Sequence, residues 1–341
     1  MTQKLIVITG ITGFQGFSVA NAFLSSPYWK IRGLTRSPTS ARAQSWISRG
    51  VEIVQADIDD PATLIPAFTG AHAIFAMTDY WYPIRTPSVQ NQAQERGISK
   101  DEICAEIEVK RGKNMAIAAS SPEVMKTLER FVWSSLPDVT KLSGGKYTKV
   151  WHFDSKAQVE RFIREDRGMM ESGLAARASF VHVGLYVDNW RRSGAEIQKD
   201  ERTGGYVHVS MEGGKKKLPF VWAGRDTGVV VKKLVEDVEP GVRVLAVSQE
   251  ASYREYMATW AKVLGKVLGG DEGIKRVSEK EFREMLPPDE DIRDHLMETW
   301  KYFEEFGYDG GDEKMLYPKD VSALVLNKFP LFERRISLTA F

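Results

Sequence analysis

A glycine-rich turn near the amino terminus constrains this chain more than any other feature. The run Gly10-Ile11-Thr12-Gly13-Phe14-Gln15-Gly16 directly follows the β-branched stretch Leu5 to Thr9 and leads into a helical stretch at residues 16–26. Glycines are needed where such a backbone turns sharply, where it approaches a phosphate, and where the helix packs on the strand. Free N–H groups at the helix start, assisted by the helix dipole, can then bind the phosphate. The order of strand, turn and helix therefore predicts a dinucleotide site, with GxxGxxG spacing in place of the commoner GxGxxG.

The end of the second predicted strand, residues 30–36, indicates which dinucleotide is bound. Proteins that bind NAD place an Asp or Glu there to accept hydrogen bonds from the ribose 2′-hydroxyl. This chain has Leu34-Thr35-Arg36-Ser37 instead, without an acid. The guanidinium of Arg36 can bind a 2′-phosphate through two hydrogen bonds, assisted by Ser37 and Arg42. NADP(H) is therefore the expected cofactor.

The first half of the chain alternates short apolar runs with amphipathic stretches. Strands are expected at residues 5–9, 30–36, 51–56, 71–78, 130–135 and 175–183, with helices at 16–26, from Pro61 onward and at 151–167. This alternation predicts a doubly wound parallel sheet covered on both faces, an NAD(P)-binding Rossmann-type α/β domain over residues 1–190. Asp57 follows the third strand, where it either accepts from the adenine amino group or serves a turn or helix cap.

Residues 191–341 carry a different pattern and no glycine-rich phosphate turn. Short strands are expected at 206–211, 218–222 and 243–247, and helices at 225–236, 252–264, 278–286 and 291–306. They predict a smaller mixed α/β lobe that binds a substrate or a partner, with strands that can interleave with those of the first domain. The segment 213–217, Gly-Gly-Lys-Lys-Lys, is expected to form a solvated hairpin turn.

Charge and cysteine content exclude several classes of protein. Lys and Arg total 47 and Asp and Glu 46, a net charge of +1, so no global field attracts nucleic acid or an anionic membrane, and no nucleic-acid-reading motif is present. Cys104 is the single cysteine and the five histidines do not pair at metal-ligand spacing, so neither a disulfide nor a metal site is expected. No apolar run approaches the roughly 20 residues that span a bilayer, and no signal peptide is recognisable. A cytoplasmic location is expected, with access to the nucleus left open.

The sequence resembles the NmrA-like family, atypical members of the extended short-chain dehydrogenase/reductase superfamily. The matching segments are TGITGFQG (9–16), TRSP (35–38), VEIVQAD (51–57), TDYW (78–81), FVWSSL (131–136) and HFDSKAQVE (152–160). The resemblance extends from about residue 3 to 330, and its HFDSK and DYW elements are the more specific. It implies an NADP-binding Rossmann domain with a smaller C-terminal lobe. Members of the family divide between redox-sensing regulators and oxidoreductases, including fungal biosynthetic reductases.

The wider superfamily uses a Tyr-x-x-x-Lys pair and a serine from the fifth strand for catalysis. By this resemblance Lys156 is the lysine, which would also hold the nicotinamide ribose, and Ser134 or Ser135 is the serine, but His152 occupies the tyrosine position. The four-residue spacing puts His152 and Lys156 on one helix face. The charge of Lys156 favours a neutral imidazole. His152 therefore either supplies a proton or only orients Lys156 or the cofactor, and Tyr147, in the loop before the helix, is another possible donor.

Aromatic residues follow the fourth strand, at the edge where open α/β sheets bind their ligands. Tyr80, Trp81 and Tyr82 either form the wall of an apolar substrate pocket or pack between the two lobes. Asn189 and Trp190, after the sixth strand, resemble the family's segment at the cleft and are expected to line it.

Two functions remain open on these residues. The first is an NADPH-dependent oxidoreductase that reduces a carbonyl or enone of a small aromatic or polyketide-like metabolite. The second is a non-catalytic NADP(H) sensor that binds a protein partner according to the NADPH/NADP+ ratio. The retained lysine and serines, together with the aromatic residues, favour the enzyme.

Overall fold

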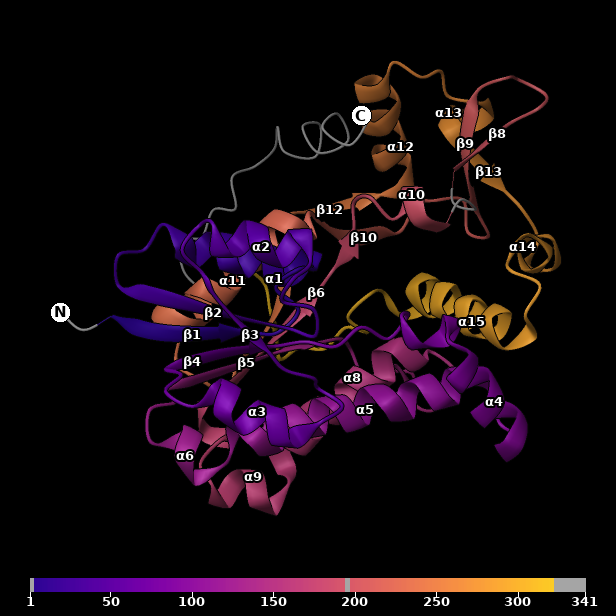
Figure 1. The fold of residues 1–341 in the computed structure, drawn as a ribbon. Helices are drawn as coiled ribbons and strands as arrows, with labels where there is room; N and C mark the ends of the chain where they lie inside the picture. The colour runs from indigo at the N-terminus through magenta and orange to yellow at the C-terminus, as the bar shows by residue number, and fades with distance from the viewer. Residues whose placement is uncertain (1–2, 194–196, 322–341) are drawn as a thin grey trace.

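The centre of the molecule is a parallel sheet of eight strands between two layers of helices (Figure 1). The computed structural model describes residues 3–193 and 197–321. Across the sheet the strands are β14 (Met315–Leu316), β11 (Arg243–Ala246), β6 (Ala178–Val183), β5 (Arg130–Ser135), β4 (Ala73–Ala76), β1 (Lys4–Ile8), β2 (Trp29–Thr35) and β3 (Glu52–Gln55). Each pair of neighbours is parallel, which confirms the doubly wound α/β class predicted from the sequence.

The strand order reverses between β1 and β4. From β1 the sheet extends through β2 to β3, and the chain then returns to pair β4 on the other side of β1. Ligands of open α/β sheets bind at the carboxyl ends of the strands at such a reversal. The backbone N–H of Met77 donates to Oγ1 of Thr9 at 2.9 Å, which ties the segments after β4 and β1 together at this point.

Each face of the sheet carries apolar side chains, and a separate group of helices packs on each face. One face is covered by α3 (Pro61–Phe68), α5 (Lys100–Ala119) and α8 (Trp151–Glu165), whose buried residues form one core with the strands. The other is covered by α1 (Phe14–Leu24), α2 (Ala41–Ile47) and α11 (Ala223–Glu236). Gly228 of α11 approaches α1 so closely that its N–H donates to Oγ of Ser18 at 2.8 Å.

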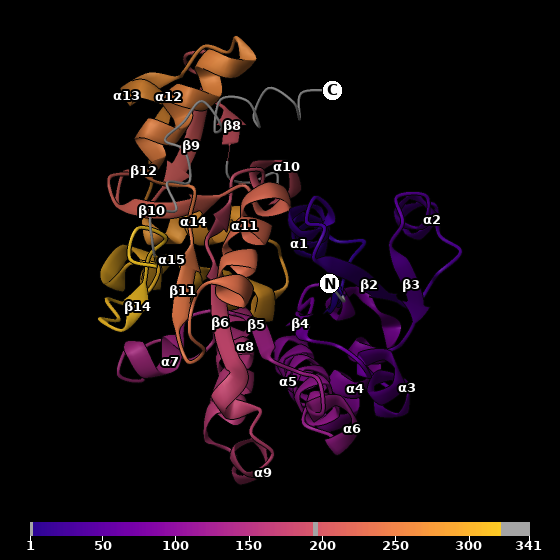
Figure 2. The ribbon, with the colours of Figure 1, turned by 90° about the vertical axis from the view of Figure 1, so that its left-hand side faces the viewer.

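The chain beyond residue 190 contributes both to this sheet and to a separate lobe. β11 and β14 extend the large sheet at the β6 edge. Two smaller sheets follow the orders β12-β10-β7 and β13-β9-β8, with β7 (Leu185–Tyr186), β8 (Ile197–Lys199), β9 (Tyr206–Ser210), β10 (Lys217–Val221), β12 (Gln249–Ser252) and β13 (Ile274–Arg276). Figure 2 shows α12 (Tyr253–Leu264), α13 (Gly270–Gly273) and these sheets beyond one end of the large sheet. The division at residue 190 stays a prediction, and its second segment includes residues 194–196 and 322–341, which lie outside the described residues.

The remaining elements connect these layers. They are η1 (Pro83–Arg85), α4 (Pro87–Arg96), α6 (Pro122–Met125), α7 (Val139–Leu142), α9 (Arg167–Glu171), η2 (Ala175–Arg177), α10 (Trp190–Ser193), α14 (Glu279–Met285) and α15 (Glu290–Phe306). Among them α15 matters most for the site, because it lies beside α5 and α8 (Figure 1).

One expectation about the second half is wrong. The segment 213–217 does turn, since Gly213 and Gly214 both have positive φ and Oγ of Ser210 accepts a hydrogen bond from each of their N–H groups. However, β9 and β10 on either side of it belong to different sheets, so the segment is no hairpin. Local sequence shows where a chain turns, whereas the partner of a strand depends on tertiary packing.

Candidate functional site

The glycine-rich turn between β1 and α1 has a geometry that only glycine permits. Gly10 adopts a φ of +63°, and a Cβ at this residue would lie 2.6 Å from Sδ of Met77. A Cβ on Gly16 would lie 2.2 Å from the carbonyl oxygen of Gly10. The N–H of Gly13 donates to that same carbonyl at 2.9 Å. The three glycines therefore let the backbone fold tightly onto the start of the helix.

Helix α1 begins at this turn. Gly13 is its N-cap residue and carries no side chain that could cap the helix, and the first turn contains no acidic residue. Gly13 and Phe14 are exposed, so the positive end of the helix dipole faces the surface. Gln15 is instead buried, where its amide donates to the hydroxyl of Tyr186 at 2.8 Å and accepts from Ser134 at 2.7 Å.

Two arginines follow β2, and one of them contacts the turn. Nη1 of Arg42 donates to the carbonyl oxygen of Thr12 at 3.4 Å. Arg36, exposed at the end of β2, has its guanidinium carbon 5.1 Å from the ring centre of Tyr82, in the segment after β4. Ser37 is exposed next to it. Of the two guanidinium groups, that of Arg42 thus lies at the turn and that of Arg36 lies beside the Tyr82 ring.

Asp57 serves the turn that leads into α3. Its Oδ1 accepts from the N–H of Asp59 at 3.0 Å, and its own N–H donates to Oγ1 of Thr63 at 3.0 Å. The turn role, one of the two alternatives left open by the sequence, is thus present. Contact of Asp57 with an adenine amino group stays a prediction.

Lys156 lies on α8 with its amino group in a buried ion pair. Nζ donates to Oε1 of Glu108 on α5, and the two side chains are 9% and 1% exposed. The hydroxyl of Thr78 donates to the same oxygen at 2.7 Å, and Ser155 donates to the other carboxylate oxygen. The additional hydrogen bonds are what a buried carboxylate needs to remain charged beside its partner. They also hold the Lys156 amino group against α5.

His152 ends a chain of hydrogen bonds that connects three helices. Its Nδ1 lies 2.5 Å from Nε2 of His295 on α15, and Nδ1 of His295 lies 2.7 Å from Oδ1 of Asp101 on α5. His295 and Asp101 are fully buried. The hydroxyl of Tyr80 donates to the same Asp101 oxygen at 2.7 Å. Residues about two hundred positions apart in the sequence therefore meet at the amino end of α8.

Electrostatics keep the His152 ring neutral. Burial, the neighbouring His295 and the charge of Lys156 hold the pKa of His152 well below its ordinary value. Burial and the Asp101 carboxylate raise the pKa of Tyr80, so its hydroxyl remains a hydrogen-bond donor. The neutral imidazole expected from the sequence is thus supported by the structure.

The three aromatic residues after β4 point to different surroundings. Trp81, 39% exposed, stacks on His295 with ring centres 5.3 Å apart and planes at 16°, and its ring centre lies 5.1 Å from that of His152. Tyr80 is 1% exposed and faces the interior. Tyr82 lies at Arg36, as described above. Among the three, Trp81 is therefore the exposed ring beside the histidines.

The two serines at the end of β5 are buried and hydrogen-bonded. Ser134 is joined to the glycine-rich turn through Gln15. The hydroxyl of Ser135 lies 3.5 Å from the backbone oxygen of Lys156, within hydrogen-bonding distance. Both serines therefore link β5 to neighbouring parts of the site.

The other expected residues pack into the C-terminal lobe. Tyr147 is 5% exposed, and its hydroxyl donates to Oε2 of Glu305 at 2.8 Å. Burial and Glu305 raise the pKa of this hydroxyl. Asn189 lies in the turn before α10, and Trp190 packs edge-on against Trp260 of α12 with ring centres 5.7 Å apart. These contacts account for Tyr147 and Trp190 as parts of the lobe's core.

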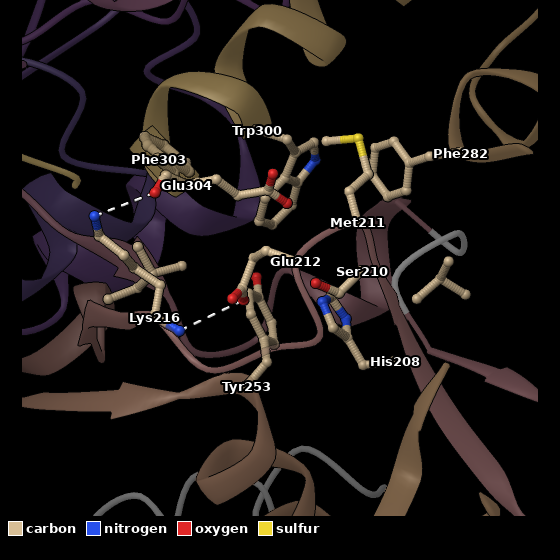
Figure 3. A pocket seen from close by; sticks show the side chains of 12 residues that line it. His208, Ser210, Met211, Glu212, Lys216, Tyr253, Phe282, Trp300, Phe303 and Glu304 are labelled. Carbon is tan, nitrogen blue, oxygen red and sulfur yellow. Dashed lines mark hydrogen bonds between the residues drawn. The ribbon is translucent and has the colours of Figure 1, made fainter. Parts of the chain in front are cut away.

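A separate hollow lies in the lobe between β9, β10 and helices α14 and α15 (Figure 3). The carboxyl groups of Glu212 and Glu304 and the ring of Trp300 border it, and Nζ of Lys216 donates to the backbone oxygen of Glu304 at 3.2 Å. Burial and the nearby Glu212 raise the pKa of Glu304. None of the residues expected at the site lines this hollow.

Sequence reasoning missed the partners of Lys156 and His152. Asp101, Cys104 and Glu108 are spaced i, i+3 and i+7, so they share one face of α5, and all three are buried. Two acidic residues on the buried face of a helix, together with a cysteine, were the sequence signal that could have indicated these partners. His295 lies on the buried stripe of α15 with Tyr302, seven residues later.

Residues 3–193 and 197–321 contain no group of three or more His, Cys, Asp or Glu side chains that could hold a metal ion. None of the helices in those ranges combines the length and apolar character needed to cross a bilayer.

The fold and the glycine-rich turn define a Rossmann-type α/β protein, and comparison with known proteins gives its family. The model of the NmrA-like family matches residues 2–327. The chain therefore belongs to the NmrA-like family, which confirms the resemblance.

Curated relatives include fungal proteins named NmrA-like family domain-containing oxidoreductases. One is ptmS of Penicillium ochrochloron, 25% identical over 92% of this chain and 82% of that protein. Another is hkm9 of Aspergillus hancockii, 27% identical over 69% of this chain, a match that spans 64% of the relative's own length.

Solved structures share the fold. The negative transcriptional regulator NmrA in complex with NADP has a TM-score of 0.64 at 17% identity, with 99% of this chain and 92% of that chain covered. The NADPH-dependent quinone oxidoreductase QOR2 of Escherichia coli, complexed with NADPH, has a TM-score of 0.65 at 18% identity, with 98% and 99% covered. NmrA is also solved in complex with NAD, at a TM-score of 0.65 and 16% identity over 99% of this chain and 92% of that chain.

Proposed function

We propose that this protein is an NADPH-dependent oxidoreductase. The observation that carries the proposal is the glycine-rich turn at the reversal of strand order, where the absence of a Cβ at Gly10 and Gly16 lets the backbone fold tightly and α1 begins without a side-chain cap. These features fit a diphosphate. Arg36, with Ser37 and Arg42 nearby, fits a 2′-phosphate and favours NADP(H) over NAD(H).

The chemistry assigned to the site is reduction of a carbonyl or enone in a small aromatic or polyketide-like molecule. Bound NADPH would supply the hydride. Lys156 would hold the nicotinamide ribose, and His152 would give the proton that balances the hydride. Trp81, exposed beside both histidines, would form an apolar wall against a flat substrate. The names of the fungal relatives and of QOR2 support this reaction class.

A redox sensor is the second candidate. The structural neighbour NmrA is described as a negative transcriptional regulator and is solved with NADP and with NAD. The buried ion pair with Glu108 also gives Lys156 a partner other than a cofactor. Under this proposal the protein would bind NADP(H) without turnover and would recognise a protein partner in one oxidation state.

Turnover separates the two candidates. NADPH oxidation is followed at 340 nm with a panel of quinones, enones and aromatic ketones, using wild-type protein and His152→Ala. The enzyme proposal predicts turnover with at least one substrate class, and a large loss of kcat in the variant at unchanged NADPH affinity. Binding of NADPH without oxidation by any member of the panel favours the sensor.

A further inference from the structure

A chain of hydrogen bonds leads from His152 into the interior of the protein. Neither cofactor binding at the glycine-rich turn nor the role of Lys156 requires this chain. It runs from Asp101 through His295 to His152, with the two inner residues fully buried. We propose that these residues form a proton relay, in which Nε2 of His152 exchanges a proton with the substrate and Asp101 and His295 position that proton. The inference rests on the proposed reductase and supplies its proton source.

When both rings are neutral, the ionisation state of Asp101 determines which nitrogen carries each proton. When Asp101 is ionised it accepts, so Nδ1 of His295 carries hydrogen; Nε2 of His295 must then accept from Nδ1 of His152. Nε2 of His152 is left with a lone pair. Within the described part of the chain no hydrogen bond engages that Nε2, so it remains available to a ligand. In this state His152 is a proton acceptor.

One added proton reverses every bond in the chain. A protonated Asp101 donates to Nδ1 of His295, Nε2 of His295 donates to Nδ1 of His152, and Nε2 of His152 carries hydrogen. His152 is then a donor although its ring is uncharged. The three residues together change from a single negative charge to neutrality.

This arrangement avoids the imidazolium that the surroundings oppose. A positive ring at His152 would lie near the charge of Lys156 and among buried groups, which is why its pKa is held low. A proton stored on Asp101 adds no positive charge there. Oδ2 of Asp101 is buried and has no hydrogen-bond partner among the described residues, so the hydrogen bonds from Tyr80 and His295 both fall on Oδ1.

Several further ionisable groups face the relay from the elements around it. They are Tyr80 after β4, Lys100, Cys104 and Glu108 on α5, Lys156 on α8 and Asp291 on α15. Burial, followed by Asp101 and Glu108, raises the pKa of Cys104 to about 12, so its thiol stays neutral. This thiol is therefore not expected to exchange a proton with the relay.

The reductive step balances as follows. Bound NADPH would supply the hydride that forms a C–H bond at the substrate carbon, and the electron pair of the C=O bond would move to oxygen. That oxygen takes the proton from Nε2 of His152. The proton on Nε2 of His295 moves to Nδ1 of His152, and the proton of Asp101 moves to Nδ1 of His295. NADP+ and ionised Asp101 remain, and solvent returns one proton to the relay.

The experiment is nuclear magnetic resonance of the full-length chain with 15N-labelled histidine rings, between pH 9 and 5. Long-range nitrogen–proton spectra distinguish the two neutral tautomers from the imidazolium. The rings of His152 and His295 are identified by loss of their signals in His152→Gln and His295→Gln. We expect both rings to change together from the Nδ1–H to the Nε2–H tautomer as the pH falls. Neither ring should become an imidazolium.

Asp101→Asn is the decisive variant, because an amide cannot store the proton, and it should abolish the joint switch. Glu160→Gln is the matched control: Glu160 is another buried carboxylate, and its Oε2 lies 2.9 Å from Nε2 of His182 and not at His152. It should alter the His182 signals and leave the switch intact. If Asp101→Asn does not fold, the titration of the wild-type protein alone still tests the relay.

Three results would overturn the relay. They are an imidazolium at His152 on acidification, a His152 ring that keeps one tautomer throughout the range, and a wild-type switch that persists in Asp101→Asn. The titration requires neither NADPH nor a substrate. An observed switch without turnover on the substrate panel would therefore reject the reductase while retaining the relay, and the reverse result would reject the relay alone.

Discussion

Arg36 and Trp81 mark the two ends of the candidate site, and Tyr82 contacts Arg36. Their 5.1 Å contact lies at the end of β2, whereas Trp81, the residue before Tyr82, stacks on His295. One short segment after β4 therefore reaches from the expected 2′-phosphate position to the histidine relay. Tyr82 thus lies beside Arg36, and its place in a substrate wall stays a prediction.

Replacing Arg36 should change cofactor preference. Arg36→Ala removes charge-assisted hydrogen bonds worth about 1.5–3 kcal/mol, so the Kd for NADPH should rise roughly 10- to 100-fold while that for NADH changes little. Arg36→Lys keeps the charge but loses the planar fork, and it should give an intermediate loss. Calorimetric titration with both coenzymes measures the difference. Equal weakening of NADPH and NADH would remove Arg36 from the 2′-phosphate site.

Breaking the buried pair of Lys156 and Glu108 should destabilise the protein. Glu108→Gln leaves a buried ammonium without its counter-charge, which costs about 3–5 kcal/mol. The exposed pair of Lys126 and Glu123, with side chains 67% and 57% exposed, provides the control. Glu123→Gln should cost less than about 1 kcal/mol. Urea unfolding compares the two, and similar midpoints would mean that Lys156 does not depend on Glu108.

At the scale of elements, α1 and α11 illustrate packing that requires a glycine. A Cβ on Gly228 would lie 2.1 Å from the carbonyl oxygen of Ser18, so Gly228→Ala should push the helices apart and cost about 1–3 kcal/mol. Gly224, on the same helix, has its nearest neighbour at 3.7 Å. Gly224→Ala should therefore cause no loss. Thermal unfolding of both variants tests this, and an equal loss in the two would contradict close packing at Gly228.

Local pattern was sufficient to predict many strands and helices of this chain, but not α5, the helix that carries Asp101 and Glu108. Strand β5 has the expected bounds, and the expected strand at 175–183 is observed as a short turn, η2, followed by β6. Apolar periodicity is a local property, which is why such segments can be found without a structure. Pairing is not local: β9 and β10 were expected to be joined by a hairpin and instead belong to different sheets.

The same distinction divides the site. The glycine-rich turn, Arg36, Lys156 and His152 lie in contiguous motifs with known spacing, and they could be found from the sequence. Asp101 and His295 are 194 positions apart and contain no motif, so only the packing of α15 on α5 reveals that they meet. Tyr147 lies close to His152 in sequence but is held by Glu305 in the lobe.

At the scale of the whole molecule, the two halves of the chain share one sheet. β11 pairs with β6, and α11 covers α1, although both lie beyond residue 190. A fragment of residues 1–190 would therefore expose the edge of β6 and the apolar face of α1. We expect such a fragment to show no cooperative thermal transition by circular dichroism. A sharp transition would establish residues 1–190 as an independent domain.

The central claim is that the glycine-rich turn binds the diphosphate of a phosphorylated nicotinamide dinucleotide. Calorimetric titration of the purified, folded full-length protein with NADPH and with NADP+ tests it most directly. The account predicts saturable binding of one molecule per chain, tighter than that of NADH under the same conditions. Absence of binding heat with both oxidation states, at several temperatures, would contradict it.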